Sequence, residues 1–248
     1  MMKTRTLITT LLLTFATMIQ AQKTYLVSCG ISVYPNPKMN TRICHNDAKT
    51  IQYVYDRNGN AETVLLINEQ VNEAQVLQQM EYLYANAQPE DMIVFFYSGH
   101  GSPGSLVFYD KEVSYDKLCR IMANSKAKRK VVFLNCCYSG KMSDAATKGG
   151  TNTGKTISAS DYRNTSVLMF LSSRPNETSL YNPTDVNCIY TNHLQRALKG
   201  GADYNRDRKI TAKELYKYVH KHVLRDTNNK QHPVMWGKFD NQMVVMKW

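Results

Sequence analysis

Two apolar runs, each ending in chemically reactive side chains beside glycine, constrain this chain most strongly. One run is VVFL at residues 131–134, followed by NCCYSG at residues 135–140. The other is MIVFFY at residues 92–97, followed by SGHG at residues 98–101. Such runs are typical of strands buried on both faces of a parallel sheet, and ligands bind beyond the carboxyl ends of such strands. If the two strands are neighbours, we expect His100 and one of the two cysteines to meet above the sheet.

Strand-like and helix-like segments alternate along the chain, which predicts an α/β fold with a mostly parallel sheet covered by helices on both faces. The expected strands are residues 24–30, 62–67, 92–97, 131–134, 166–171 and 242–246, with a small hairpin at 105–109 and 112–114. The expected helices are residues 46–56, 72–87, 115–123, 190–198 and 211–224. We see no internal repeat and no second domain.

The N-terminus has the layout of a secretory signal peptide. Lys3 and Arg5 precede a largely apolar stretch at residues 7–19, and Ala21 offers a small residue for cleavage. We therefore expect residues 1–21 to be removed, residues 22–248 to form one domain, and the protein to be secreted or periplasmic; a short amphipathic anchor is the alternative. No later apolar run approaches the roughly 20 residues that a membrane helix needs, so we expect no stable membrane anchor.

The formal net charge of the 248-residue chain is +11, which favours acidic partners. The basic residues are mostly spread out, however, and the only dense run is KAKRK at residues 126–130. A nucleic-acid-binding face combines clustered basic residues with interleaved aromatics, and the sequence shows none. We expect solvated surface charge and no nucleic-acid partner.

The cysteine pattern predicts thiols rather than a disulfide framework. The six cysteines are Cys29, Cys44, Cys119, Cys136, Cys137 and Cys188, and their spacing has no regularity. A chain of this length buries enough core without disulfides. No CxxC or HxxxH spacing indicates zinc. We expect mostly reduced, buried cysteines and no metal.

A cysteine and a histidine at neighbouring strand ends are suited to acyl transfer. The thiolate is the nucleophile, and a nearby imidazole can accept the thiol proton and later protonate the leaving amine. The oxyanion that forms needs hydrogen-bond donors, and the backbone N–H groups of Gly101 and Cys137 are the candidates. This chemistry is most simply hydrolysis of a peptide bond.

These residues resemble the motifs of the metacaspases and their bacterial caspase-like relatives. YSGHG at residues 97–101 is similar to the family's histidine motif, and NCCYSG at 135–140 is similar to its D-x-C-x-S-G motif. CHNDA at residues 44–48 and QHP at 231–233 are similar to its C-x-N-D-A and Q-x-P elements. The resemblance spans about residues 24–248. It implies a caspase-like three-layer α/β/α sandwich, a cysteine-type endopeptidase, and peptide or protein substrates.

The resemblance also implies which residues act. It makes Cys137 the nucleophile and His100 its base, and leaves Cys136 at the variable position. The positions that match the family's acidic substrate-binding pocket, which accepts Arg or Lys, are Cys44, Asp47, Ser98 and Asn135. Asn135 departs from the pattern, because the family usually has Asp there. Asp47 has an alternative interpretation as a helix cap. Cleavage after Asp, as in true caspases, is less consistent with the sequence, because Arg42 does not fall at the matching position.

The loop at residues 141–165 is rich in small and polar residues, and caspase relatives are often cut in this region. Lys148 and Lys155 are therefore candidates for self-cleavage, and an inert loop is the alternative.

Calcium is the one cofactor that two features suggest. Residues 203–214 have EF-hand-like acidic and amide positions, but Arg208 stands where Gly is needed. We favour a simpler interpretation, a capping box of Thr211 and Glu214. Metacaspases also bind calcium through an acidic cluster, for which only Asp110, Glu112 and Asp116 are candidates here. We therefore expect no cofactor.

Two other functions stay open beside an exported peptidase. One is a catalytically silent caspase-like module that binds a peptide or protein. The other is an Arg-specific protease related to clostripain, which differs mainly in the pocket.

Overall fold

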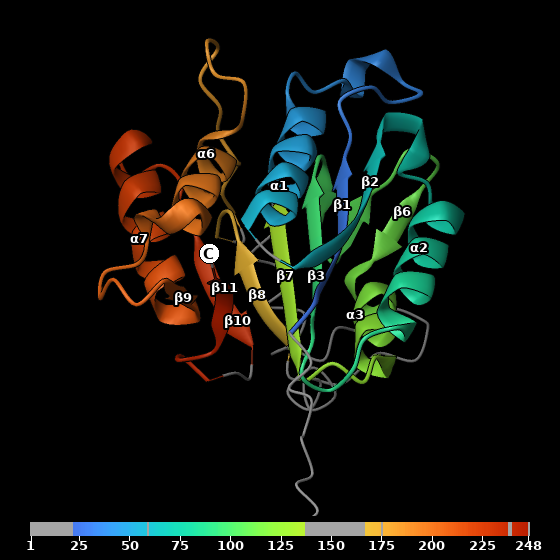
Figure 1. Ribbon diagram of the computed structural model, residues 1–248. Helices are drawn as coiled ribbons and strands as arrows, with labels where there is room; N and C mark the ends of the chain where they lie inside the picture. The colour runs from blue at the N-terminus through green and yellow to red at the C-terminus, as the bar shows by residue number, and fades with distance from the viewer. Residues whose placement is uncertain (1–21, 59, 137–166, 175, 238–239, 248) are drawn as a thin grey trace, which may run out of the picture.

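A six-stranded, mostly parallel sheet forms the centre of the computed structural model (Figure 1), which describes residues 22–58, 60–136, 167–174, 176–237 and 240–247. The strand order is β10-β8-β7-β3-β1-β2. The parallel strands are β1 (Thr24–Gly30), β2 (Ala61–Ile67), β3 (Met92–Ser98), β7 (Arg129–Asn135) and β8 (Val167–Leu171). The edge strand β10 (Val234–Gly237) is antiparallel to β8. The mostly parallel sheet is as the sequence predicts.

Helices cover both faces of this sheet and complete three layers (Figure 1). The helices α1 (Cys44–Asn58), α6 (Ile189–Arg196) and α7 (Ala212–Asp226) share one hydrophobic core with Val94 and Phe96 of β3. The helices α2 (Glu73–Ala85) and α3 (Tyr115–Asn124) share the opposite core with Phe95 and Tyr97. Successive strand residues point to opposite faces, so an uninterrupted apolar run supplies both cores. The predicted three-layer α/β/α sandwich is confirmed.

Short strands and turns surround this framework. The hairpin predicted after His100 is confirmed as β5 (Ser105–Val107) and β6 (Glu112–Ser114), with an additional strand β4 (Gly101–Ser102) on its edge. The last strand, β11 (Val244–Lys247), pairs with β9 (Lys209–Thr211) in a separate two-stranded sheet. Three single turns are η1 (Pro37–Met39), η2 (Asn68–Gln70) and the π-type η3 (Ala197–Gly201). The sequence did not predict β4, β9 or β10.

The EF-hand-like segment is a capped turn. Glu214 N–H donates to Thr211 Oγ1 at 3.3 Å, and Thr211 N–H donates to Glu214 Oε2 at 2.9 Å, which is the capping box that the sequence favours. The Asp203 carboxylate accepts the backbone N–H groups of Asp207 and Arg208 at 3.2 and 3.0 Å. Arg208 makes the sharp turn with a φ of 62°, the conformation for which calcium loops use glycine.

The last lysine of the basic run at residues 126–130 departs from the prediction of solvated charge. Lys130 is buried, and its Nζ donates to the backbone carbonyl of Ala123 at 3.1 Å. Burial lowers the pKa of this ammonium group. Because residue 130 lies inside β7, its backbone position is dictated by the sheet.

Five of the six cysteines lie in the described residues, and all five are buried: Cys29, Cys44, Cys119, Cys136 and Cys188. Of these, Cys29, Cys44, Cys119 and Cys188 are free thiols. No helix among the described residues is long and apolar enough to span a membrane.

Candidate active site

The two strands that the sequence singles out are neighbours. β3 and β7 are parallel, and their last residues, Ser98 and Asn135, are register partners. His100 follows Ser98 by two residues, at the carboxyl edge of the sheet. The predicted adjacency of the strands is confirmed. Cys137 lies outside the described residues, as do Lys148 and Lys155, so a contact between His100 and Cys137 stays a prediction.

The His100 side chain is held by a backbone carbonyl. Its Nε2 lies 2.6 Å from the carbonyl oxygen of Met39 in η1. Because a carbonyl oxygen only accepts, Nε2 carries the proton, and Nδ1 of the neutral ring is left as the basic nitrogen. The Met39 carbonyl therefore orients the imidazole and fixes its tautomer.

Two tyrosines hold the turn that carries His100. The Tyr34 hydroxyl accepts the His100 backbone N–H at 2.9 Å, and its ring lies 5.1 Å from the imidazole. The Tyr97 hydroxyl lies 2.9 Å from the His100 carbonyl and 2.7 Å from that of Val107. Any Cβ at Gly99 would lie 2.6 and 2.8 Å from the two tyrosine hydroxyls, closer than real contacts. The glycine before the histidine is therefore needed for this arrangement.

Asp47 is the centre of the predicted substrate-binding residues. It lies in the first turn of α1 and is fully buried. Its Oδ2 accepts from Ser98 Oγ at 2.7 Å and from Asn135 Nδ2 at 2.9 Å. Its Oδ1 accepts from Asn187 Nδ2 at 3.1 Å and from the Cys188 backbone N–H at 3.0 Å. The helix-cap interpretation of Asp47 is wrong, because α1 already begins at Cys44 and the carboxylate bonds groups outside its own helix.

Burial raises the pKa of the Asp47 carboxyl, and the hydrogen bonds from Ser98, Cys188 and Asn187 oppose that rise. A desolvated carboxylate is stabilised most by a cation. No lysine or arginine among the described residues forms an ion pair with Asp47. Among the described residues, four hydrogen-bond donors rather than a cation therefore stabilise the carboxylate.

Asn135, which stands where the resemblance implies Asp, offers an unfilled acceptor. Its Nδ2 donates to Asp47 and lies 3.3 Å from both Ser98 Oγ and Thr191 Oγ1. Its Oδ1 is buried and has no hydrogen-bond partner among the described residues. A buried acceptor without a partner is costly, and a donor on a ligand removes that cost.

Two cysteines border the carboxylate. Cys44 is the first residue of α1 and Cys188 is the N-cap of α6, and their side chains are buried. Their Sγ atoms and a carboxylate oxygen of Asp47 all lie within 4.8 Å of one another. A hydrogen bond between the two thiols lowers the pKa of Cys44 and raises that of Cys188. The sequence did not single out Cys188, Asn187 or Thr191, because the only signal is a cysteine before a helix.

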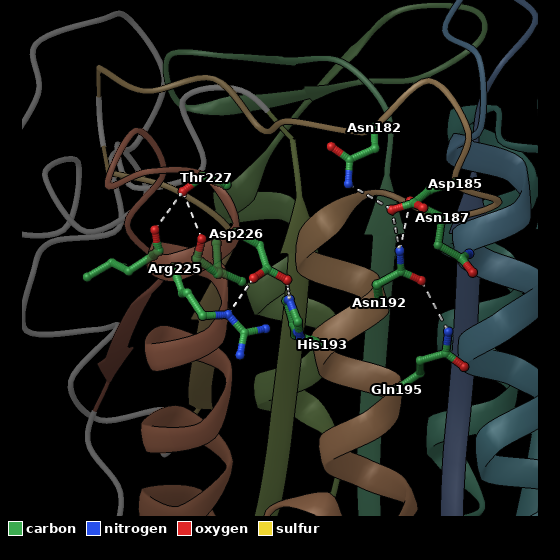
Figure 2. Close-up of polar contacts among 11 residues, drawn as sticks. Asn182, Asp185, Asn187, Asn192, His193, Gln195, Arg225, Asp226 and Thr227 are labelled. Carbon is green, nitrogen blue, oxygen red and sulfur yellow. Dashed lines mark hydrogen bonds and ion pairs between the residues drawn. The ribbon is translucent and has the colours of Figure 1, made fainter.

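An amide network fixes the loop that carries Asn187 into α6 (Figure 2). Asn182 Nδ2 and Asn192 Nδ2 both donate to Asp185 Oδ2, at 3.1 and 3.0 Å. Asn192 Nδ2 also lies 3.3 Å from the carbonyl oxygen of Asn187. These contacts tie the loop to the first turn of α6, so Asn187 and Cys188 are held in place.

A buried histidine links α6 to α7 beside this network (Figure 2). His193 Nε2 lies 2.8 Å from Asp226 Oδ2, and the histidine side chain is almost fully buried. Burial lowers the pKa of His193, outweighing the Asp226 carboxylate, which acts to raise it.

Comparisons with known proteins agree with this architecture. The family profile described as the caspase domain matches residues 25–243. The chain belongs to the caspase-domain family. The curated relatives that it matches include the metacaspase-1A proteins of Aspergillus niger and Aspergillus fumigatus, which are 32% and 33% identical to it over 94 residues. Each match covers 34% of this chain and 23% of the relative, so the matched part spans about a quarter of those proteins.

Solved caspase-like structures show the same fold. Caspase-1 from Spodoptera frugiperda has a TM-score of 0.65 and 15% identity, and the alignment covers 92% of this chain and 90% of that one. A protein from Geobacter sulfurreducens has a TM-score of 0.63 and 18% identity, with 91% and 97% covered. At these identities the likeness establishes the fold, and the family assignment makes this chain a cysteine-peptidase relative.

Proposed function

We propose that this protein is a cysteine endopeptidase that hydrolyses peptide bonds after Arg or Lys through a His100–Cys137 dyad. The observation that carries the proposal is the His100 imidazole at the carboxyl edge of β3, with Nε2 on the Met39 carbonyl and Nδ1 left as base. The family's nucleophile motif follows the neighbouring strand β7. Substrates are peptides or proteins.

In the proposed reaction, His100 Nδ1 accepts the proton of the Cys137 thiol, and the thiolate attacks the scissile carbonyl carbon. The backbone N–H groups of Gly101 and Cys137 donate to the oxyanion. The imidazolium then gives its proton to the leaving amine, and water hydrolyses the acyl-enzyme with the imidazole as base. The Met39 carbonyl keeps Nδ1 directed at the reaction throughout.

The pocket chemistry supports a basic residue before the cut. Asp47 supplies a buried carboxylate, and Asn135 Oδ1 supplies a buried acceptor that has no donor in the described part of the chain. The N–H groups of a guanidinium or an ammonium match both. Asn135 Nδ2 has two further acceptors, Ser98 Oγ and Thr191 Oγ1, so a bound cation can take its place on Asp47 Oδ2. Cys44 completes the wall of the proposed pocket.

A fluorogenic peptide panel tests the specificity. The peptides differ only in the residue before the cut, which is Arg, Lys, Asp or Asn, and each is assayed with and without calcium. We expect cleavage of the Arg and Lys peptides and no calcium requirement. Cleavage of the Asp peptide alone contradicts the role of Asp47.

A thiol-directed peptidyl probe separates an enzyme from a silent peptide-binding module. We expect the probe to label Cys137 in the wild type and to lose the label in His100→Ala. A folded His100→Ala protein that labels as fast as wild type excludes the dyad.

We also propose self-processing after Lys148 or Lys155 and export after removal of residues 1–21. Incubation of purified wild type beside Cys137→Ala tests the first, since only an active enzyme changes its own banding pattern. N-terminal sequencing of the mature protein tests the second.

A further inference from the structure

We propose that Cys44, Asp47 and Cys188 form a binding site for one thiophilic divalent cation, such as zinc. The two sulfur atoms and a carboxylate oxygen lie within 4.8 Å of one another, and all three side chains are buried. No zinc-like spacing appears in the sequence, because the ligands come from the start of α1 and from the residue before α6.

The geometry is close to that of a tetrahedral centre. With metal–sulfur and metal–oxygen bonds of about 2.3 and 2.1 Å, tetrahedral ligand atoms lie roughly 3.5–3.8 Å apart. Atoms within 4.8 Å of one another reach those separations when each moves by less than about 1 Å, which rotamer adjustment allows. Three protein ligands leave the fourth position for water, as in open zinc sites.

Two helix N-termini offset part of the cost of ionising these buried ligands. Cys44 is the first residue of α1 and Cys188 is the N-cap of α6, so two helix N-termini stabilise negative charge on the sulfur atoms. Two thiolates and a carboxylate carry three negative charges, and a divalent cation offsets two of them. Soft sulfur ligands select zinc, cadmium and similar ions over calcium and magnesium.

Asp47 can bind the ion without leaving its present amide donors unpaired. On Oδ1, the Asn187 amide also donates to Thr50 Oγ1 at 3.0 Å. On Oδ2, the Asn135 amide also lies 3.3 Å from Ser98 and Thr191. Either oxygen can therefore exchange an amide donor for a metal bond while that amide keeps a partner.

The binding step balances in atoms and charge. The cation forms two metal–sulfur bonds and one metal–oxygen bond, and the Cys44 and Cys188 thiol protons are released to solvent. Because the ion contacts Asp47, it excludes the basic substrate side chain; this regulatory consequence rests on the proposed function. We therefore infer that zinc is a competitive inhibitor that acts by occupying the proposed pocket.

Cadmium titration of the Cys137→Ala protein tests the site without using activity, and this background removes the thiol of the proposed dyad. We expect one cadmium ion per chain, the ultraviolet charge-transfer band of cadmium–thiolate bonds, and release of about two protons by calorimetry in buffers of different ionisation enthalpy. Adding Cys188→Ala should remove the band and weaken binding by more than about 100-fold, the upper limit for losing an outer-shell partner. Cys119→Ala, which removes a buried thiol elsewhere, should leave both unchanged.

Binding that survives the loss of Cys188, or that is absent from the fully reduced protein, overturns the proposal. Cys188→Ser, which keeps the size of the side chain, provides the same comparison if the alanine variant does not fold. Thiol counting before titration detects a Cys44–Cys188 disulfide, and a disulfide that persists under reducing conditions also overturns the site. If the chain lacks peptidase activity, the titration still reports on the metal site.

Discussion

Replacement of Asp47 by Asn separates charge from shape in the proposed pocket. The carboxylate is buried, and its Oδ2 is bound by Ser98 and Asn135. In Asp47→Asn, the new Oδ1 can keep the Cys188 N–H bond. The new amide N–H groups can donate to the rotatable Ser98 hydroxyl and to a flipped Asn135, whose Oδ1 has no partner among the described residues of the wild type. We therefore expect Asp47→Asn to fold.

Loss of the negative charge should leave stability intact but weaken activity. Burial raises the folded-state pKa of Asp47 above its unfolded value, so ionisation of this group disfavours the folded state as pH rises above 3.8. The variant lacks that penalty, so its free energy of unfolding at pH 7 should be no lower than that of wild type. A charge-assisted hydrogen bond to a bound guanidinium contributes about 1.5–3 kcal/mol. At about 1.36 kcal/mol per factor of ten, kcat/KM for an Arg peptide should fall about 10- to 150-fold.

The assay compares two fluorogenic peptides that differ only in Arg or norleucine before the cut, with urea unfolding of both proteins at pH 7. The Arg preference should collapse, while the small rate on norleucine should change by less than about threefold. An equal loss on both peptides would refute the reasoning, because it would make Asp47 a structural group. So would a variant that keeps its Arg preference.

Three further perturbations test the scaffold around the site. Tyr34→Phe leaves the His100 backbone N–H without its acceptor, so the free energy of unfolding in urea should fall by about 1–3 kcal/mol. Steady-state kinetics should show a lower kcat with little change in KM. An unchanged kcat contradicts the positioning role. Gly30→Ala puts a Cβ 2.5 Å from the Cys44 carbonyl oxygen, and should lower stability by about 1–3 kcal/mol; a thermal midpoint equal to that of wild type argues against the close approach. Burial depresses the pKa of His193 below 6.5, so the stability that the neutral ring contributes is lost as pH falls below about 6.5. The thermal unfolding midpoint should therefore decline between pH 7 and 5, and His193→Gln should flatten that decline. Parallel pH profiles of the two proteins contradict this prediction.

Hydrophobic patterning predicted the three layers of the fold because the pattern depends only on residues that are adjacent in the sequence. The run at residues 92–97 is apolar throughout because alternate side chains enter opposite cores. β10 and β9 escaped prediction because each is a short strand of three or four residues whose pairing is decided by tertiary contacts. The helix α1 begins at Cys44, three residues before Asp47, so Asp47 lies inside the first turn and bonds the Cys188 N–H instead of capping the helix.

The sequence predicted those residues of the site whose side chains take part directly, and missed those that act through the backbone or a long loop. The resemblance identified His100 and Asp47, and the structure brings Asp47, Ser98 and Asn135 within hydrogen-bonding distance of one another. The partner of the His100 ring is the backbone carbonyl of Met39, which any residue supplies, so no sequence pattern marks it. Cys188 meets Asp47 through a long loop whose path depends on side-chain amides, and that path has no local signature.

The four donors on Asp47 come from three segments of the chain: β3, β7, and the adjacent residues Asn187 and Cys188 just before α6. One carboxylate thus cross-links the sheet to the helix layer that covers it. Binding of an arginine side chain to Asp47 should consequently also change the scaffold away from the reacting bond. We expect slower amide hydrogen exchange in the first turns of α1 and α6 when a peptide aldehyde ending in arginine is bound. Recognition of the substrate and rigidity of the scaffold would then depend on the same carboxylate.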